Sequence, residues 1–192
     1  NKIAYGPKVE KCVIDLDYIF DKNMKNLADF KNKKIKDIAI CILDRPRHKE
    51  YIDQLKALKV NLRLISDGDI SGALLVTNKD YNVDIFFGIG GGPEGVLASA
   101  ALDTFNCYFQ GRFLFNTEKD KIRANKMGIT NLTKKYELNE IVKGDSIFCA
   151  TGITETEITA AVKKENTKFV TETLVTHKES TIEIIKSEEA IA

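Results

Sequence analysis

Four short segments of the sequence carry residue types that could bind or transform a small ligand, and each follows an apolar run. They are Asp44–His48, Asp67–Asp69, Gly88–Gly95 and Thr151–Thr154. The first is basic, the second is acidic, and the third combines free backbone with one carboxylate. In open α/β sheets, ligands bind outside the carboxyl ends of the strands. We therefore expect these segments to be loops that lie along one edge of a parallel sheet and share one site.

The basic segment places Arg45 and Arg47 on either side of Pro46, just before a predicted helix. A proline fixes its own φ and pushes the preceding residue into an extended conformation. Two guanidinium groups beside a helix N-terminus suit a phosphate dianion. A solvated basic turn is the alternative that this segment alone leaves open. We interpret His48 as a helix-start or surface residue and leave it out of the predicted site.

The acidic segment Asp67-Gly68-Asp69 contains a strong turn signal, so it could be a turn and nothing more. Its carboxylates could instead accept hydrogen bonds from sugar hydroxyls. They could also hold a metal ion, since hard cations prefer oxygen ligands. Either of these functions requires that one of the two aspartates point inward.

The glycine-rich segment has the spacing G-x-G-x-x-G at Gly90, Gly92 and Gly95, which is typical of dinucleotide sites. Pro93 argues against such a site, because it removes an amide that would hold the pyrophosphate. Glu94 would repel the pyrophosphate from the first helical turn. A helix start on a tight loop is one alternative. In the other, Glu94 binds a divalent cation that bridges to a substrate phosphate, and the glycines let the substrate approach the backbone closely.

Alternating apolar and helical patterns define the elements that must position these segments. Strands are predicted at Ile38–Leu43, Val60–Ser66, Val83–Phe87 and Ser146–Ala150. Helices are predicted at Asp21–Lys34, His48–Leu58, from Ile70, Pro93–Phe105, Glu118–Met127, Glu137–Lys143 and just after Gly152. The order implies a mostly parallel sheet, and the strands are apolar almost throughout, as expected when helices cover both faces.

The last part of the sequence follows a different pattern, with the period of two that is typical of strands. Lys168–Thr176 and Thr181–Lys186 predict an antiparallel hairpin joined by the polar turn His177–Ser180. The predicted fold class is therefore a layered α/β sandwich with a mostly parallel sheet, flanking helices and a C-terminal β-hairpin.

Composition excludes several classes of protein. The 192 residues are 43% hydrophobic and 30% charged, with a formal net charge of +1. This balance argues against a bulk nucleic-acid or membrane binder. No apolar run approaches the roughly 20 residues that a membrane helix needs. The four cysteines form no C-x-x-C pair, so we expect buried, reduced thiols and a cytoplasmic location.

The run IGGGPEGVLASAAL (Ile89–Leu102) resembles the signature of class II fructose-1,6-bisphosphatase. Further stretches resemble the same family and occur in the family's order. They are NKIAYGP (1–7), DRPRH (44–48), DGD (67–69), QGR (110–112), MGI (127–129) and ATGIT (150–154). The resemblance covers essentially the whole chain, and several motifs in order are far more specific than any one alone.

This resemblance implies a metal-dependent sugar phosphatase, related to the lithium-sensitive phosphatases, that removes the 1-phosphate of fructose 1,6-bisphosphate in gluconeogenesis. Carried over by motif, the substrate contacts are Arg45, Pro46, Arg47, Asp67, Gly68, Asp69 and the backbone of Gly91. Glu94 would be a ligand of Mg²⁺ or Mn²⁺. We also expect a homo-oligomer that binds neither nucleic acid nor membrane.

The sequence departs from the family in one respect. The family's other metal-binding carboxylates lie in an aspartate-proline-acid-glycine-threonine motif and its neighbours, and this chain contains no such motif. We therefore expect no catalytic group in this chain, which alone would bind phosphosugar weakly and hydrolyse nothing. On this interpretation residues 1–35 are an N-terminal strand, at Lys2–Tyr5, and a helix that continue from an upstream segment, and residues 36–192 form the α/β substrate-binding domain. A non-catalytic phosphosugar-binding or regulatory module, and a phosphatase for sedoheptulose 1,7-bisphosphate or an inositol phosphate, remain alternatives.

Overall fold

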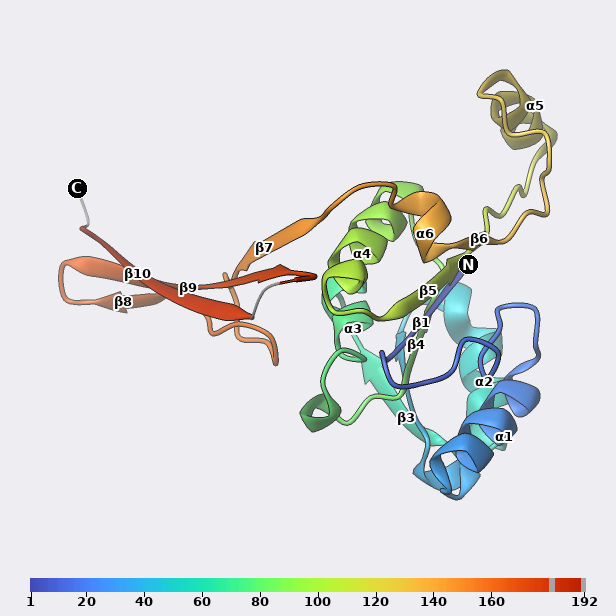
Figure 1. The fold of residues 1–192 in the computed structure, drawn as a ribbon, viewed down its shortest axis with the longest axis horizontal. Coiled ribbons are helices and arrows are strands. Elements are labelled where there is room, and N and C mark those ends of the chain that lie inside the picture. The colour runs from blue at the N-terminus through green and yellow to red at the C-terminus, as the bar shows by residue number, and fades with distance from the viewer. Residues whose placement is uncertain (180–181, 191–192) are drawn as a thin grey trace.

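A computed structural model of the chain describes residues 1–179 and 182–190. It contains a six-stranded sheet with helices packed on it, and a four-stranded antiparallel sheet that projects to one side (Figure 1). Among the described residues, no helix combines the length and the apolar character needed to cross a membrane.

The six-stranded sheet has the order β3-β2-β4-β1-β5-β6. Its strands are β1 (Lys2–Tyr5), β2 (Ala39–Leu43), β3 (Asn61–Ile65), β4 (Ile85–Gly88), β5 (Tyr108–Gly111) and β6 (Tyr136–Glu137). β2 is parallel to both β3 and β4, whereas β1 is antiparallel to β4 and β5, and β6 to β5. Four of the six strands, β2, β3, β4 and β5, therefore run in one direction, which confirms the predicted mostly parallel sheet.

Helices cover both faces of this sheet, as predicted. α1 (Phe20–Lys31) and α2 (Lys49–Ala57) pack on one face, and α3 (Asp69–Leu74), α4 (Gly92–Thr104) and α6 (Leu138–Ile141) pack on the other. α5 (Glu118–Lys126) lies apart from the sheet (Figure 1). Short 3₁₀ turns occupy η1 (Ile35–Asp37), η2 (Pro46–His48) and η3 (Lys79–Tyr81).

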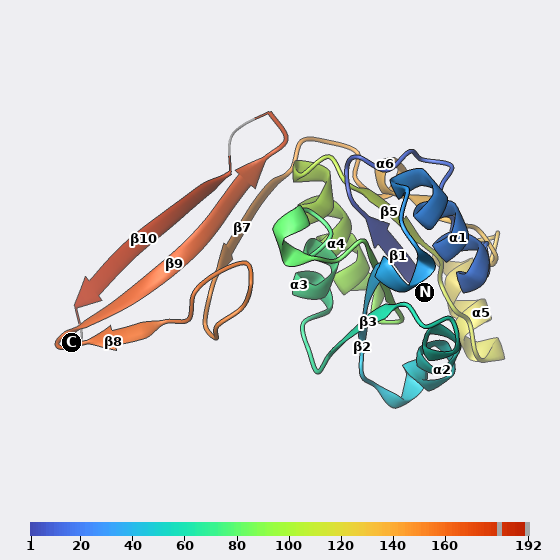
Figure 2. The ribbon, with the colours of Figure 1, turned by 90° about the horizontal axis from the view of Figure 1, so that it is seen from below.

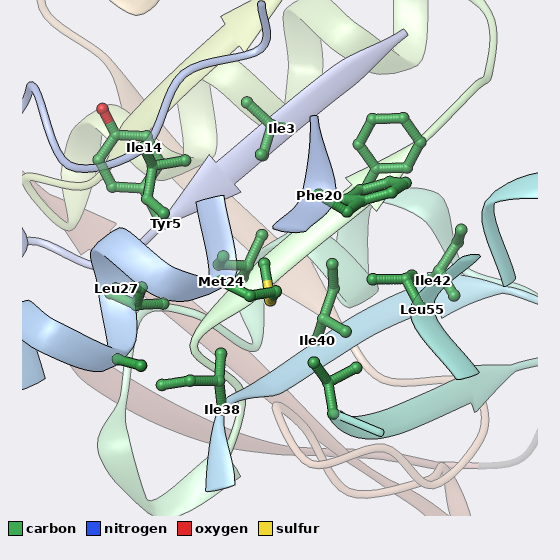
Figure 3. Packing of buried hydrophobic residues seen from close by; sticks show 14 of the residues in the cluster. Ile3, Tyr5, Ile14, Phe20, Met24, Leu27, Ile38, Ile40, Ile42 and Leu55 are labelled. Carbon is green, nitrogen blue, oxygen red and sulfur yellow. The ribbon is translucent and has the colours of Figure 1, made fainter. Parts of the chain in front are cut away.

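β2 is buried along its whole length because its side chains alternate between two hydrophobic cores. Ile40 and Ile42 pack in the core that α1 and α2 cover, beside Met24 and Leu55 (Figure 3). On the other face, Cys41 and Leu43 pack in the core that contains residues of α3 and α4. A fully apolar strand is thus the natural choice for the centre of this layered fold.

The projecting sheet contains β7 (Ile147–Thr151), β8 (Lys163–Glu165), β9 (Lys168–His177) and β10 (Glu183–Ala190) (Figures 1 and 2). β9 and β10 form the predicted antiparallel hairpin. Residue 180, the last of the predicted turn, and residue 181, the first of the predicted second strand, lie outside the described residues.

Two predictions about the segment around β7 are wrong. β7 does not extend the parallel sheet but pairs antiparallel with β9. Exposed and half-buried residues alternate along β7, so only one of its faces packs on the protein, as is common in antiparallel sheets. The predicted helix after Gly152 is absent, because residues 152–162 form bends and irregular loop.

The cysteines are all free, but the prediction that they are buried holds for two of the four. Cys41 and Cys107 are buried, and burial raises the pKa of each thiol to about 12. Cys12 and Cys149 are exposed, Cys149 because it lies on the outer face of β7.

Candidate functional site

The loops that follow the parallel strands β2, β3 and β4 meet in one groove of about 1090 Å³. Predicted site residues that line it are Arg45, Arg47, Asp67, Gly68, Asp69, Gly91 and Glu94. Pro46 is not among the lining residues, since it starts η2 between the two arginines. The segment Thr151–Thr154 also lines the groove, although it approaches from the projecting sheet. The structure therefore brings together all four loops that the sequence singled out.

The basic loop has the backbone that its proline dictates. Arg45 is extended, with φ −131° and ψ 149°, and Pro46 opens the 3₁₀ turn. Arg47 donates a hydrogen bond from Nε to Ile89 O at 2.7 Å, which ties the basic loop to the glycine loop. Arg45 lies 3.4 Å from Asp67 across the groove, and because both side chains are well exposed this ion pair contributes little to stability.

The two aspartates of the acidic loop have different environments. Asp67 is 88% exposed, and its Oδ1 accepts a hydrogen bond from Gly68 N–H at 2.9 Å. Gly68 has φ +88°, a left-handed conformation that favours glycine. Asp69, the first residue of α3, points inward and is ion-paired with Lys2. The structure therefore meets the requirement that one aspartate point inward.

The glycine loop leads into α4, which begins at Gly92 with Pro93 and Glu94 in its first turn. A carboxylate in this position is favourable because it faces the positive end of the helix dipole. The Glu94 carboxylate is folded back against Gly91, so closely that a Cβ on Gly91 would collide with it. Glycine at position 91 therefore allows Glu94 to lie beside the loop backbone.

Gly90 is similarly constrained, and we expect Gly90→Ala to lower the free energy of unfolding by about 1–3 kcal/mol. A Cβ at this position would lie 3.3 Å from Lys2 Nζ and inside contact distance of the Asp69 carboxylate. Urea unfolding would measure the change. Gly95→Ala is the matched control, since a Cβ there meets nothing within 4 Å and alanine stabilises a helix. Equal stabilities for the two variants would contradict the packing described here.

His48 corrects the sequence interpretation, because it is neither a surface residue nor only a helix start. It is fully buried and joins the end of β2 to the glycine loop. Its Nε2 accepts a hydrogen bond from Ile89 N–H at 2.8 Å, and its Nδ1 lies 2.8 Å from Leu43 O. The imidazole is therefore neutral with the proton on Nδ1, and burial lowers the pKa of His48 below its ordinary value of 6.5.

The described residues provide only part of a metal site. In residues 1–179 and 182–190 there is no group of three or more His, Cys, Asp or Glu side chains that could hold an ion. Of the carboxylates that line the groove, Asp67 and Asp69 are paired with Arg45 and Lys2. Glu94 is exposed and offers oxygen ligands that suit a hard cation. One carboxylate fits one position of a coordination shell but does not complete it.

The fold and the groove define an α/β protein that presents guanidinium groups, carboxylates and a glycine-bordered helix start at the carboxyl ends of parallel strands. Such a set of groups suits a ligand that has both phosphate and hydroxyl groups.

The family model described as bacterial fructose-1,6-bisphosphatase, glpX-encoded, matches residues 1–189, and the chain belongs to this family. A protein of Microcystis aeruginosa named D-fructose 1,6-bisphosphatase class 2/sedoheptulose 1,7-bisphosphatase is 34% identical, over 80% of this chain and 48% of its own length. A protein of Synechocystis sp. with the same name is 32% identical, over 94% of this chain and 56% of its own length. The chain thus spans about half the length of these relatives.

Proposed function

We propose that the groove binds fructose 1,6-bisphosphate and that the chain supplies the substrate-binding half of a phosphatase that releases the 1-phosphate. The observation that carries this proposal is the convergence of the basic, acidic and glycine loops in one groove. It occurs in a chain that the fructose-1,6-bisphosphatase family matches along nearly its whole length.

Each group has a distinct role in the proposed site. Arg45 and Arg47 bind and orient a phosphate, because guanidinium forks match its oxygens. Asp67 and Asp69 face the sugar hydroxyls, Gly68 allows the turn between them, and the backbone at Gly91 lies close to the ligand. Glu94 holds Mg²⁺ or Mn²⁺, and a bound cation would neutralise phosphate charge and activate water. We assign no general base or nucleophile to the described residues.

Sedoheptulose 1,7-bisphosphate is the second candidate substrate, because the names of both relatives include it. Both sugars would present the same groups, a phosphate and neighbouring hydroxyls, to the groove. A phosphatase for an inositol phosphate and a non-catalytic phosphosugar-binding module are the remaining alternatives. The homo-oligomeric state and the cytoplasmic location also stay predictions.

Titration of the chain with each ligand, followed by backbone NMR, tests the proposal. Amide shifts that map to the groove with fructose 1,6-bisphosphate, and weaker ones with an inositol phosphate, would support it. Shifts that map elsewhere would contradict it. We expect residues 1–192 alone to release no phosphate in Mg²⁺ or Mn²⁺, since Glu94 is one ligand of several. Metal-dependent release by this chain alone would show that the assignment of one ligand to it is wrong.

We expect Arg47→Ala to raise Kd for fructose 1,6-bisphosphate, and KM in an active enzyme that contains this chain, by about tenfold or more, as expected for a lost charge-assisted hydrogen bond. Arg47→Lys keeps the charge but loses the fork, so its Kd should lie between those of Arg47→Ala and the unaltered protein. Calorimetric titration would measure Kd. The control is Arg123→Ala, which removes an exposed arginine near the end of α5, outside the groove. If both alanine variants bind equally well, Arg47 is not a ligand of the phosphate.

A further inference from the structure

Lys2, the first residue of β1, carries a buried charge directly behind the glycine loop. Only 6% of its side chain is exposed, and its Nζ is ion-paired with Asp69 Oδ2. β1 lies beside β4 with Lys2 opposite Gly88, so the ammonium lies where the glycine loop leaves the sheet. A lysine is almost never this buried unless it is paired. The ion pair therefore constrains every element that it touches.

The Asp69 carboxylate of this ion pair packs against the backbone of the glycine loop. A Cβ on Gly90 would collide with Asp69 Oδ2, and a Cβ on Gly88 would lie 3.3 Å from Asp69 Oδ1. The Asp69 carboxylate thus packs tightly against the backbone of the glycine loop, and its ion pair with Lys2 keeps it in this position. Asp69 Oδ1 is buried and has no hydrogen-bond partner among the described residues, so the carboxylate depends on Lys2 for compensation of its charge.

Lys2 also changes the charge that a phosphate ligand would meet. The charged side chains that line the groove are two arginines and three carboxylates, which sum to −1. Lys2 approaches from the far side of the loop, where it lines a second cavity of about 550 Å³, and it brings the sum to zero. Gly90 and Gly91 line both cavities and separate them. Without Lys2 the groove would carry net negative charge where an anion must bind.

We infer that Lys2 is a positioning residue of the groove. Acting through Asp69, it fixes the backbone of Gly88–Gly91 and cancels a carboxylate charge beside the phosphate. The expected effect of Lys2 on ligand binding rests on the proposed function of the groove. The expected effect of Lys2 on the loop backbone does not.

Lys2→Met removes the ammonium while keeping most of the side-chain volume. We expect Kd for fructose 1,6-bisphosphate to rise by about tenfold or more, the scale expected when one partner of a buried charge pair is removed. Lys2→Arg keeps the charge and should restore most of the affinity. The matched control is Lys31→Met, because Lys31 is ion-paired with Asp84, a partly buried residue just before the opposite, amino end of β4. Both lysine-to-methionine variants should lower the melting temperature, but Lys31→Met should leave Kd within about twofold.

A double-mutant cycle separates positioning through Asp69 from an independent effect. In an Asp69→Asn background, Lys2→Met should change Kd by less than about twofold, since the carboxylate on which Lys2 acts is gone. This double variant also has no unpaired buried charge, so it stays measurable if Lys2→Met alone fails to fold. Equal effects of Lys2→Met in both backgrounds, or equal losses of affinity in Lys2→Met and Lys31→Met, would overturn the inference.

Backbone NMR without ligand keeps the two proposals distinct. The amides of Ile89, Gly90 and Gly91 should shift more in Lys2→Met than in Lys31→Met. If the unaltered protein binds no bisphosphate while these shifts are seen, the proposed function fails and the coupling of Lys2 to the loop stands. If the shifts are absent, the inference about Lys2 fails whatever the groove binds.

Discussion

Glu94→Gln is expected to lower the rate of metal-dependent hydrolysis of fructose 1,6-bisphosphate by about 10²-fold or more, in a protein that contains this chain and has the activity. The substitution keeps the shape of the side chain but removes the charge that a hard cation requires. Binding of the sugar bisphosphate should change much less, because the arginines and the loop backbone remain. Initial rates at saturating Mg²⁺ or Mn²⁺ and calorimetric Kd values would measure the two effects separately.

The matched control for Glu94 is Glu118→Gln. Glu118 also lies in the first turn of a helix, α5, where it is ion-paired with Lys121 outside the groove. Its replacement should leave turnover within about twofold, since surface pairs contribute little. Near-normal turnover of Glu94→Gln at saturating metal would show that Glu94 is not a ligand.

Local sequence patterns sufficed to predict the edge of the sheet that carries the groove. The run Ile38–Leu43 is apolar at every position, which favours a strand buried on both faces, and β2 is such a strand. A loop and a helix follow it, and the same order recurs after β3 and β4. Because parallel strands end at one edge, the three loops had to meet wherever each strand was correctly identified.

Features that depend on partners distant in sequence could not be predicted in the same way. β1 was expected as a strand, but its place between β4 and β5 follows from pairing that no local pattern encodes. β6 has two residues and gives no periodic signal. β7 is as apolar in sequence as a parallel strand, yet its partner is β9. Its outer face leaves Ile147 and Cys149 exposed.

The same limit applies to the two buried residues whose side chains help to fix the position of the glycine loop. Lys2 and His48 look like ordinary surface types in the sequence, because their partners Asp69 and Ile89 lie far along the chain. Polar residues of these types are usually exposed, so their burial is informative only once the structure shows what they touch. Loop residues that would contact a ligand were thus easier to predict than the residues that hold those loops in place.

We expect His48→Leu to lower the free energy of unfolding by about 1–3 kcal/mol near neutral pH and to disturb the glycine loop. Ile89 N–H would lose its buried acceptor, and Leu43 O would lose its hydrogen bond with the imidazole. Leucine fills the space but replaces neither hydrogen bond. Urea unfolding gives the free energy, and the amide resonances of Ile89 and Gly90 report the loop.

His48 should also make the stability of the fold depend on pH. Its pKa is lowered in the folded state, so below 6.5 the unfolded chain binds more protons than the folded one. The stabilisation is therefore complete above pH 6.5 and declines as the pH falls from 6.5 toward the folded pKa. His177→Leu, which removes the only other histidine, should keep this decline, whereas His48→Leu should lose it. A decline of equal size in both variants would mean that protonation of His48 does not control the stability of the glycine loop.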